Sequence, residues 1–79
     1  MNQKLVGERI KTLRIEKLNM SQEDFAKLID VDRTYLCRLE SGQKNLTLET
    51  LNKVCAGLSI SLKDFFDFKS SDYEDSDCR

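Results

Sequence analysis

The sequence lacks histidine, proline and tryptophan, and it has only three cysteines and three glycines among 79 residues. Histidine is the commonest general base, so its absence disfavours an enzyme. The three cysteines (Cys37, Cys55 and Cys78) include no C-x-x-C pair and have no histidine to join them. We therefore expect free thiols, with no metal site and no cofactor.

Long apolar runs are also missing. None approaches the roughly 20 residues that a membrane-spanning helix needs. The first eight residues, Met-Asn-Gln-Lys-Leu-Val-Gly-Glu, show no apolar segment of the kind that marks a signal peptide. We therefore expect a cytoplasmic protein that makes no contact with a membrane.

Charge is unevenly distributed along the chain. Residues 1–66 carry eleven Lys/Arg and nine Asp/Glu, whereas residues 67–79 carry two and five. The net charge of −1 therefore hides a mildly basic domain, which is weak support for a nucleic-acid partner. We expect one domain over residues 1–68 and an acidic, disordered tail over residues 69–79.

The stretch from Ser21 to Gly42 predicts two short helices joined by a tight turn. Ser21 and Asp24 have the spacing of a capping box, and Asp32 can cap the second helix. Asp30 lies in the turn, where a positive φ is often required and Asp is among the few residues that tolerate it. This is the pattern of a helix-turn-helix, whose second helix enters the major groove of DNA.

Helical spacing of apolar residues predicts three further helices, and hence an all-α, five-helix domain. The first helix runs from about Gln3 to Lys17 and ends before Asn19. The fourth follows a Thr47 cap and ends near Gly57, and the fifth follows Ser61. The expected inner faces of the first four helices, in chain order, are Val6, Ile10, Leu13; Phe25, Leu28, Ile29; Leu36, Leu39; and Leu48, Leu51, Val54, Cys55, Leu58. The fifth helix carries Leu62, Phe65 and Phe66.

The outer face of the helix that follows Asp32 has the chemistry of base recognition. Arginine can bind guanine through two hydrogen bonds, and threonine can contact a base through its hydroxyl or methyl group. The candidate base-reading residues are Arg33, Thr34, Tyr35, Cys37 and Arg38. Tyr35 lies at the margin, where packing is an equal alternative. Cys37 is interpreted as a small residue tolerated on this face, although a redox role is an alternative.

The motifs Ser21-Gln22-Glu23, Leu39-Glu40-Ser41-Gly42, Thr47-Leu48-Glu49 and Asp64-Phe65-Phe66 resemble the lambdoid-repressor and Cro-like helix-turn-helix family over roughly residues 4–68. The resemblance implies a five-helix domain of a bacterium or phage that binds operator DNA as a homodimer. Asp32-Arg33-Thr34-Tyr35, followed by Asn45-Leu46-Thr47, further resembles the controller proteins of restriction–modification systems. Phage or plasmid repressors and antitoxins share much of the pattern.

The resemblance also implies roles for individual residues. Arg14 and Glu40 match a family ion pair that ties the first helix to the third, and Gln22 matches a residue that binds a phosphate and braces the recognition helix. The residues expected at the DNA backbone are Ser21, Gln22, Ser41, Gln43, Lys44 and Asn45. Asp30 departs from the glycine that is usual in the family's turn.

The apolar residues near the end of the domain exceed what a small core should need. These are Leu58, Ile60, Phe65, Phe66 and Phe68. They either close the monomer or form a two-fold interface that spaces two recognition helices by about 34 Å, one turn of DNA. We expect the homodimer, with RNA polymerase as a further candidate partner. The rival hypothesis is a protein-interaction module, antitoxin-like or polymerase-binding, that scarcely contacts DNA.

Overall fold

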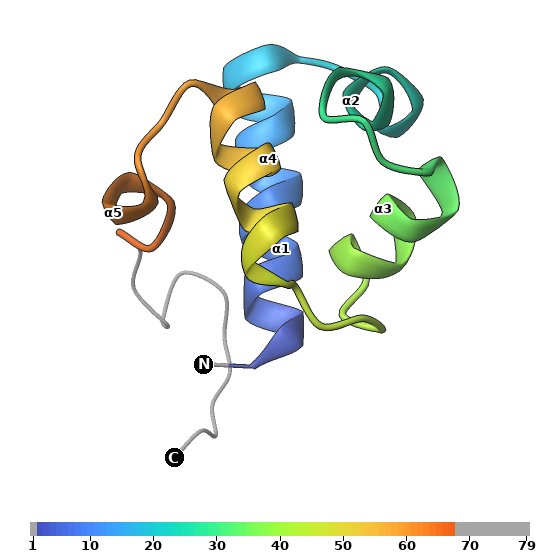
Figure 1. The fold of residues 1–79 in the computed structure, drawn as a ribbon, viewed down its shortest axis with the longest axis horizontal. Coiled ribbons are helices and arrows are strands. Elements are labelled where there is room, and N and C mark those ends of the chain that lie inside the picture. The colour runs from blue at the N-terminus through green and yellow to red at the C-terminus, as the bar shows by residue number, and fades with distance from the viewer. Residues whose placement is uncertain (1, 68–79) are drawn as a thin grey trace.

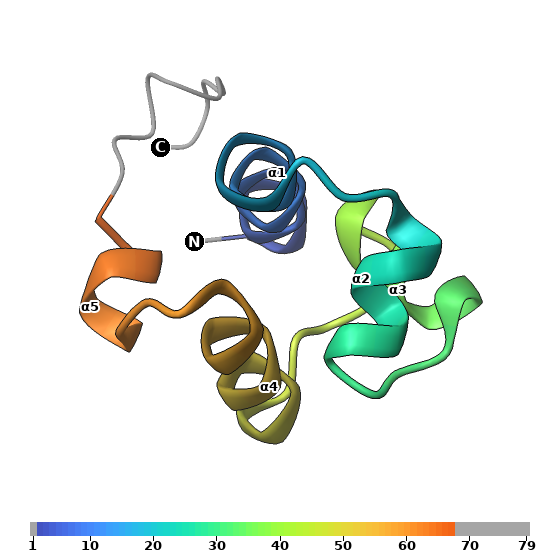
Figure 2. The ribbon, with the colours of Figure 1, turned by 90° about the horizontal axis from the view of Figure 1, so that it is seen from above.

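The computed structural model describes residues 2–67, which form a small bundle of helices. The α-helices are α1 (Gln3–Leu13), α2 (Gln22–Leu28), α3 (Arg33–Glu40), α4 (Leu48–Leu58) and α5 (Leu62–Phe65), and a π-helical turn, η1 (Arg14–Leu18), extends α1. Helices α1 and α4 form a central pair, with α2 and α3 on one side and α5 on the other (Figures 1 and 2). The expected all-α, five-helix architecture is confirmed. The expected tail lies outside the described residues.

Side-chain caps define where the α-helices begin. The backbone N–H of Asp24 donates to Ser21 Oγ at 3.1 Å, and that of Thr34 donates to Asp32 Oδ2 at 3.1 Å. Asn2, Thr47 and Ser61 cap the other three helices in the same way. Because each cap satisfies a backbone donor that the helix itself cannot, these residues fix the helix starts locally.

Residues with positive φ follow four of the segments. Asn19 (φ 51°) follows η1 as expected, and Asp30 (φ 61°) turns the chain between α2 and α3. Gly42 (φ 83°) follows α3. The fourth helix ends differently from the prediction, because Ser59 (φ 60°), and not Gly57, adopts the left-handed conformation. Gly57 lies inside α4, where a Cβ would come within 2.6 Å of Ile29 Cγ2, so its role is close packing.

The core gathers residues from all five α-helices, including Ile10, Phe25, Leu36, Val54 and Phe65. Cys55 belongs to it, and burial raises the pKa of its thiol. Two of the expected inner residues are corrected. Leu28 is 49% exposed and Leu48 is 69% exposed, because α2 and α4 each turn these positions away from the bundle. Among residues 2–67, no helix is both long and apolar enough to cross a membrane.

Candidate nucleic-acid interface

Helix α3 presents its polar face to an open hollow of about 430 Å³. Leu36 and Leu39 hold the opposite face of the helix in the core. Side chains from α2, α3 and the loop after α3 surround the hollow: Gln22, Arg33, Thr34, Cys37, Arg38, Ser41 and Gln43. The structure thus brings together four of the five candidate base-reading residues and three of the six candidate backbone residues.

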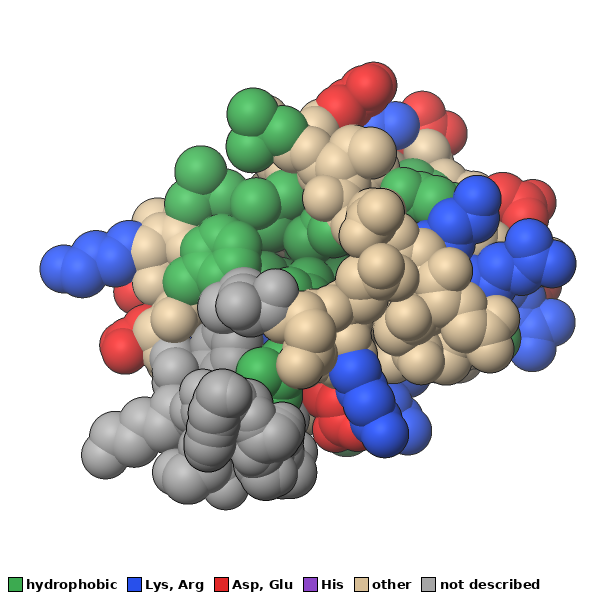
Figure 3. All heavy atoms as spheres, turned by 90° about the horizontal axis from the view of Figure 1, so that it is seen from below, with side chains coloured by type: hydrophobic (Ala, Val, Ile, Leu, Met, Phe, Trp, Pro, Cys, Tyr) green, Lys and Arg blue, Asp and Glu red, His purple; other side chains and the backbone are tan. Residues whose placement is uncertain are grey.

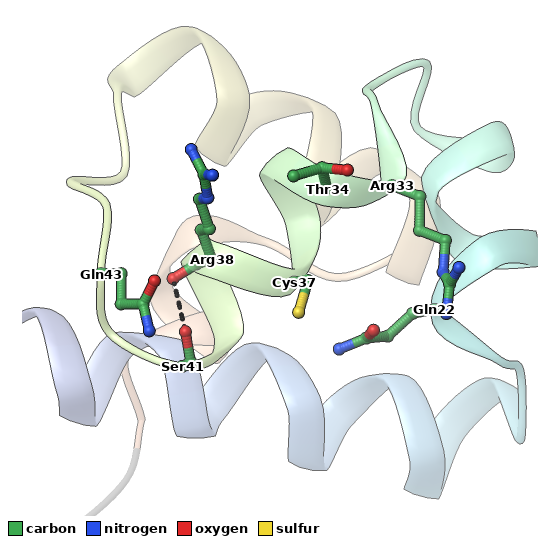
Figure 4. Close-up of a pocket in the computed structure, with 7 residues that line it drawn as sticks. All are labelled: Gln22, Arg33, Thr34, Cys37, Arg38, Ser41 and Gln43. Carbon is green, nitrogen blue, oxygen red and sulfur yellow. Dashed lines mark hydrogen bonds between the residues drawn. The ribbon is translucent and has the colours of Figure 1, made fainter.

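The two arginines lie at opposite ends of this face (Figure 4). Arg33, at the start of α3, extends toward Gln22, whereas Arg38 lies near the end of the helix on the side of Gln43. Both side chains are exposed. Ser41 is held at the end of the helix because its Oγ donates to the carbonyl of Arg38 at 3.2 Å. Exposed guanidinium groups flanking a threonine suit the edges of DNA bases.

The remaining candidates lie outside the hollow. Tyr35 is half-buried; its hydroxyl lies 3.3 Å from Thr50 Oγ1, and the ammonium of Lys44 lies 6.0 Å from its ring centre. Lys44 and Asn45 line a second hollow beside α1 and α4. Ser21 is exposed and caps α2. Tyr35 therefore packs against the start of α4, the alternative that its marginal position in the sequence left open.

A buried ion pair fixes α3 to Arg14, the first residue of η1. Arg14 Nε donates to Glu40 Oε2 at 2.8 Å, and Nη2 donates to Oε1 at 3.0 Å. Gln22 Nε2 donates to the same carboxylate at 2.9 Å. A third guanidinium nitrogen, Nη1, donates to the carbonyl of Met20. One carboxylate therefore joins η1, α2 and α3 at the edge of the hollow.

Close backbone contact supports the same end of α3. Gly7 of α1 lies against the end of α3, where an added Cβ would come within 2.2 Å of the Leu39 carbonyl oxygen. Gln3 Nε2 donates to the carbonyl of Gly42 at 3.1 Å. Sequence reasoning assigned no role to Gly7 or Gln3. Both lie far from α3 along the chain, so local patterns carried no sign of these contacts.

The expected interface residues divide into two groups. Leu58 and Phe65 are buried in the monomer core, with exposed fractions of 3% and 0%, so their apolar surface is already used. Their burial favours the alternative that these two residues close the monomer. Ile60 is half-buried and packs on the core, whereas Phe66 remains 41% exposed. Phe68 lies outside the described residues.

The structure leaves other apolar residues exposed on α4 and α5. Leu62 on α5 is 42% exposed, and Leu48 begins α4 one turn before Leu51. Phe66, Leu46 and Leu51 line one hollow of about 270 Å³, which continues this apolar region toward α1. Leu48 was expected in the core. Helical spacing of apolar residues predicts which face of a helix points inward, but not how much of that face the neighbouring helices cover. The exposure of these residues therefore could not be predicted from the sequence.

Comparison with known proteins decides what kind of domain this is. A family model described as helix-turn-helix matches residues 10–65. The chain belongs to the helix-turn-helix family. The match spans the ion pair, the recognition helix and both helices that follow it.

Relatives of this helix-turn-helix chain share most of its length. Control protein C.MunI from Mycoplasma sp. is 48% identical over 60 residues, which cover 76% of this chain and 81% of that protein. Control protein C.BamHI from Bacillus amyloliquefaciens is 38% identical over 64 residues, covering 81% and 79%. These relatives are named as control proteins and not as enzymes.

A solved structure agrees with the family assignment. The restriction-modification controller protein C.AhdI from Aeromonas hydrophila has a TM-score of 0.72 and 36% sequence identity. The alignment covers 77% of this helix-turn-helix chain and 91% of that protein. The similarity therefore extends over the whole compact domain.

Proposed function

We propose that this protein is a sequence-specific transcriptional regulator that binds operator DNA as a homodimer and controls a restriction–modification operon. The observation that carries this proposal is the exposed row of Arg33, Thr34 and Arg38 along the hollow of a helix-turn-helix domain. The relatives named as control proteins support the restriction–modification assignment. Such a regulator acts where its DNA is, in the bacterial cytoplasm.

In this proposal α3 enters the major groove. Arg33 and Arg38 donate to guanine edges, and Thr34 contacts a base or a thymine methyl group. Cys37 faces the same hollow as a small side chain that lets the helix approach. Gln22, Ser41 and Gln43 border this row and contact the phosphates on either side, together with Ser21, Lys44 and Asn45. These phosphate contacts set the position and affinity of the protein on DNA but carry no sequence information.

The proposed interface with a second copy is the exposed apolar surface formed by Leu48, Leu62 and Phe66. Figure 3 shows hydrophobic side chains gathered on the side where α4 and α5 lie, and Lys and Arg side chains toward the side of α2 and α3. This separation lets one surface bind a second copy while the other binds DNA. A two-fold dimer would place two α3 helices on one face of the duplex.

Regulation requires that the bound dimer alters the access of RNA polymerase to a promoter. A dimer whose operator overlaps the promoter would exclude polymerase, and one bound beside it would offer polymerase an additional contact. Transcription assays with purified polymerase, with and without the protein, distinguish these two modes. The same assay tests the rival interaction module, which would alter transcription without binding DNA.

The DNA-binding test uses the DNA upstream of the protein's own coding sequence. We expect Arg38→Ala to lose about 1–3 kcal/mol of binding free energy and to relax specificity at one base pair. Lys44→Ala should weaken binding to all sequences similarly and reduce the salt dependence by the equivalent of about one phosphate contact. Gel-shift titrations at several salt concentrations measure both effects.

Lys27→Ala is the matched control for charge. Lys27 lies on α2 outside the hollow, in an exposed ion pair with Glu23 at 3.8 Å that contributes little to stability. It should leave affinity, specificity and salt dependence close to those of the native protein. Unchanged binding by both Arg38→Ala and Lys44→Ala would show that this face does not contact DNA.

A further inference from the structure

Arg9 joins the middle of α1 to the end of α5. Its Nε donates to the carbonyl oxygen of Phe65 at 2.7 Å, and its Nη2 donates to that of Asp64 at 2.7 Å. Nη2 also lies 3.4 Å from the carbonyl oxygen of Asp67. One guanidinium group therefore contacts three carbonyl oxygens within four consecutive residues. The side chain is half-buried, so solvent screens these contacts only in part.

The geometry matters because α5 has only four residues. A helix of one turn has no independent stability, and its last carbonyl groups have no partner within the helix. The planar fork of an arginine can bind several carbonyl oxygens at once, whereas a lysine is a single point charge. Arg9 thus supplies from α1 the hydrogen bonds that a longer helix would make itself.

Helix α5 has a second attachment, which acts differently. The Phe65 ring is completely buried, and it contacts the Phe66 ring edge-on, with the ring centres 4.9 Å apart and the planes at 85°. A single buried ring holds α5 against the core but leaves rotation about that ring open. The bonds from Arg9 to the backbone on either side of Phe65 remove that rotation, and so fix the directions in which Leu62 and Phe66 point.

We propose that Arg9 is a positioning residue for dimerisation: by binding the carbonyl groups that end α5, it holds Leu62 and Phe66 in the orientation that a second copy recognises. The inference rests on the proposed homodimer. It assigns to α1, which also contacts the end of α3 through Gly7, a second contact that orients the interface. Arg9 therefore affects DNA binding only through the dimer.

The first test measures the dimer dissociation constant by sedimentation equilibrium of the full chain. We expect Arg9→Ala to raise it at least tenfold, and Arg9→Lys to have an intermediate effect because lysine keeps the charge and loses the fork. Lys11→Ala removes a positive charge from an exposed position on the same helix and should change it less than twofold. Far-ultraviolet circular dichroism and urea unfolding establish that each variant is folded.

The second test separates positioning from loss of structure. Two copies joined by a flexible Gly/Ser linker of about 30 residues are held at high effective concentration, so association no longer limits DNA binding. Arg9→Ala should weaken operator binding tenfold or more in the separate chains, and binding should return to within about threefold of the native level in the joined pair. Hydrogen exchange should be faster in α5 and unchanged in α3.

The outcomes distinguish this inference from the function on which it rests. A native protein that stays monomeric at micromolar concentration and on DNA would overturn the proposed homodimer. A native dimer that Arg9→Ala and Arg9→Lys leave unchanged would overturn the role of Arg9 alone. Joined copies of Arg9→Ala that still fail to bind DNA would also overturn it, because the defect would then lie within the monomer.

Discussion

The α2–α3 half and the α4–α5 half of this domain begin their helices alike and expose opposite chemistry. Ser21 and Asp32 cap the first pair as Thr47 and Ser61 cap the second. Helix α3 presents Arg33, Thr34 and Arg38 to solvent, whereas α4 and α5 present Leu48, Leu62 and Phe66. Similar local signals thus begin the helices of both halves, and we propose that the exposed side chains of one half bind DNA and those of the other bind a second copy.

The two halves also differ in how they are held. Helix α3 is fixed at its C-terminal end by two contacts, the buried Arg14–Glu40 pair and the backbone contact of Gly7. Helix α5 depends on one buried ring, Phe65, and on one half-buried guanidinium group, that of Arg9. We therefore expect α3 to be held more rigidly than α5. The following changes test that contrast.

The largest effect should come from Phe65→Ala. Removing this completely buried ring leaves a cavity under α5, and truncations of buried aromatic side chains cost about 3–5 kcal/mol of unfolding free energy. Urea unfolding measures the loss. Phe66→Ala is the matched control, because that ring is 41% exposed. It should lower the free energy of unfolding much less but weaken the dimer; equal losses in stability would contradict the division between the two rings.

Next in size is Glu40→Gln, which leaves the Arg14 guanidinium buried without its counter-charge. We expect a loss of about 3 kcal/mol in unfolding free energy, because removing one partner of a buried ion pair leaves an uncompensated buried charge. Replacing both partners with apolar residues leaves no such charge. The double variant Arg14→Met with Glu40→Met should cost less than Glu40→Gln alone. The single variants Arg14→Met and Glu40→Met and their combination form a double-mutant cycle; thermal and urea unfolding measure each corner, and simple additivity would show that the pair does not act as a unit.

The smallest effect on stability should come from Leu48→Gln, compared with Leu28→Gln. Both leucines are exposed, so each change should alter the free energy of unfolding by about 0.5 kcal/mol or less. Only Leu48 belongs to the proposed interface. Sedimentation should therefore show a weaker dimer for Leu48→Gln and an unchanged dimer for Leu28→Gln. Similar dimer constants for the two variants would move the interface elsewhere.

Much of the candidate site could be predicted from the sequence because its signals are local. The caps at Ser21, Asp32 and Thr47, and the positive φ at Asp30, depend on neighbouring residues alone. Seven of the eleven residues expected at DNA surround one hollow. Tyr35 lies outside this hollow because it packs against α4, a contact that helical spacing within α3 could not reveal. Lys44 also lies outside it.

The prediction was wrong where the extent of a contact decides burial. Helical spacing placed Leu28 and Leu48 inside, but α2 and α4 touch their neighbours over narrower faces than the apolar stripes suggest. Gly57 was interpreted as a helix end, whereas it lets Ile29 approach α4 closely. Periodicity gives the direction of a face, and only the packed neighbours set its width.

The sequence alone determined the helix starts, the turn of the helix-turn-helix and the polar face of α3, because backbone capping and side-chain periodicity act over a few residues. Tertiary structure decided which apolar residues close the monomer and which remain for a second copy. It also decided that Arg9 would bind the end of α5, 55 to 58 residues away along the chain. Contacts between distant segments depend on how the helices pack, and no local pattern records that.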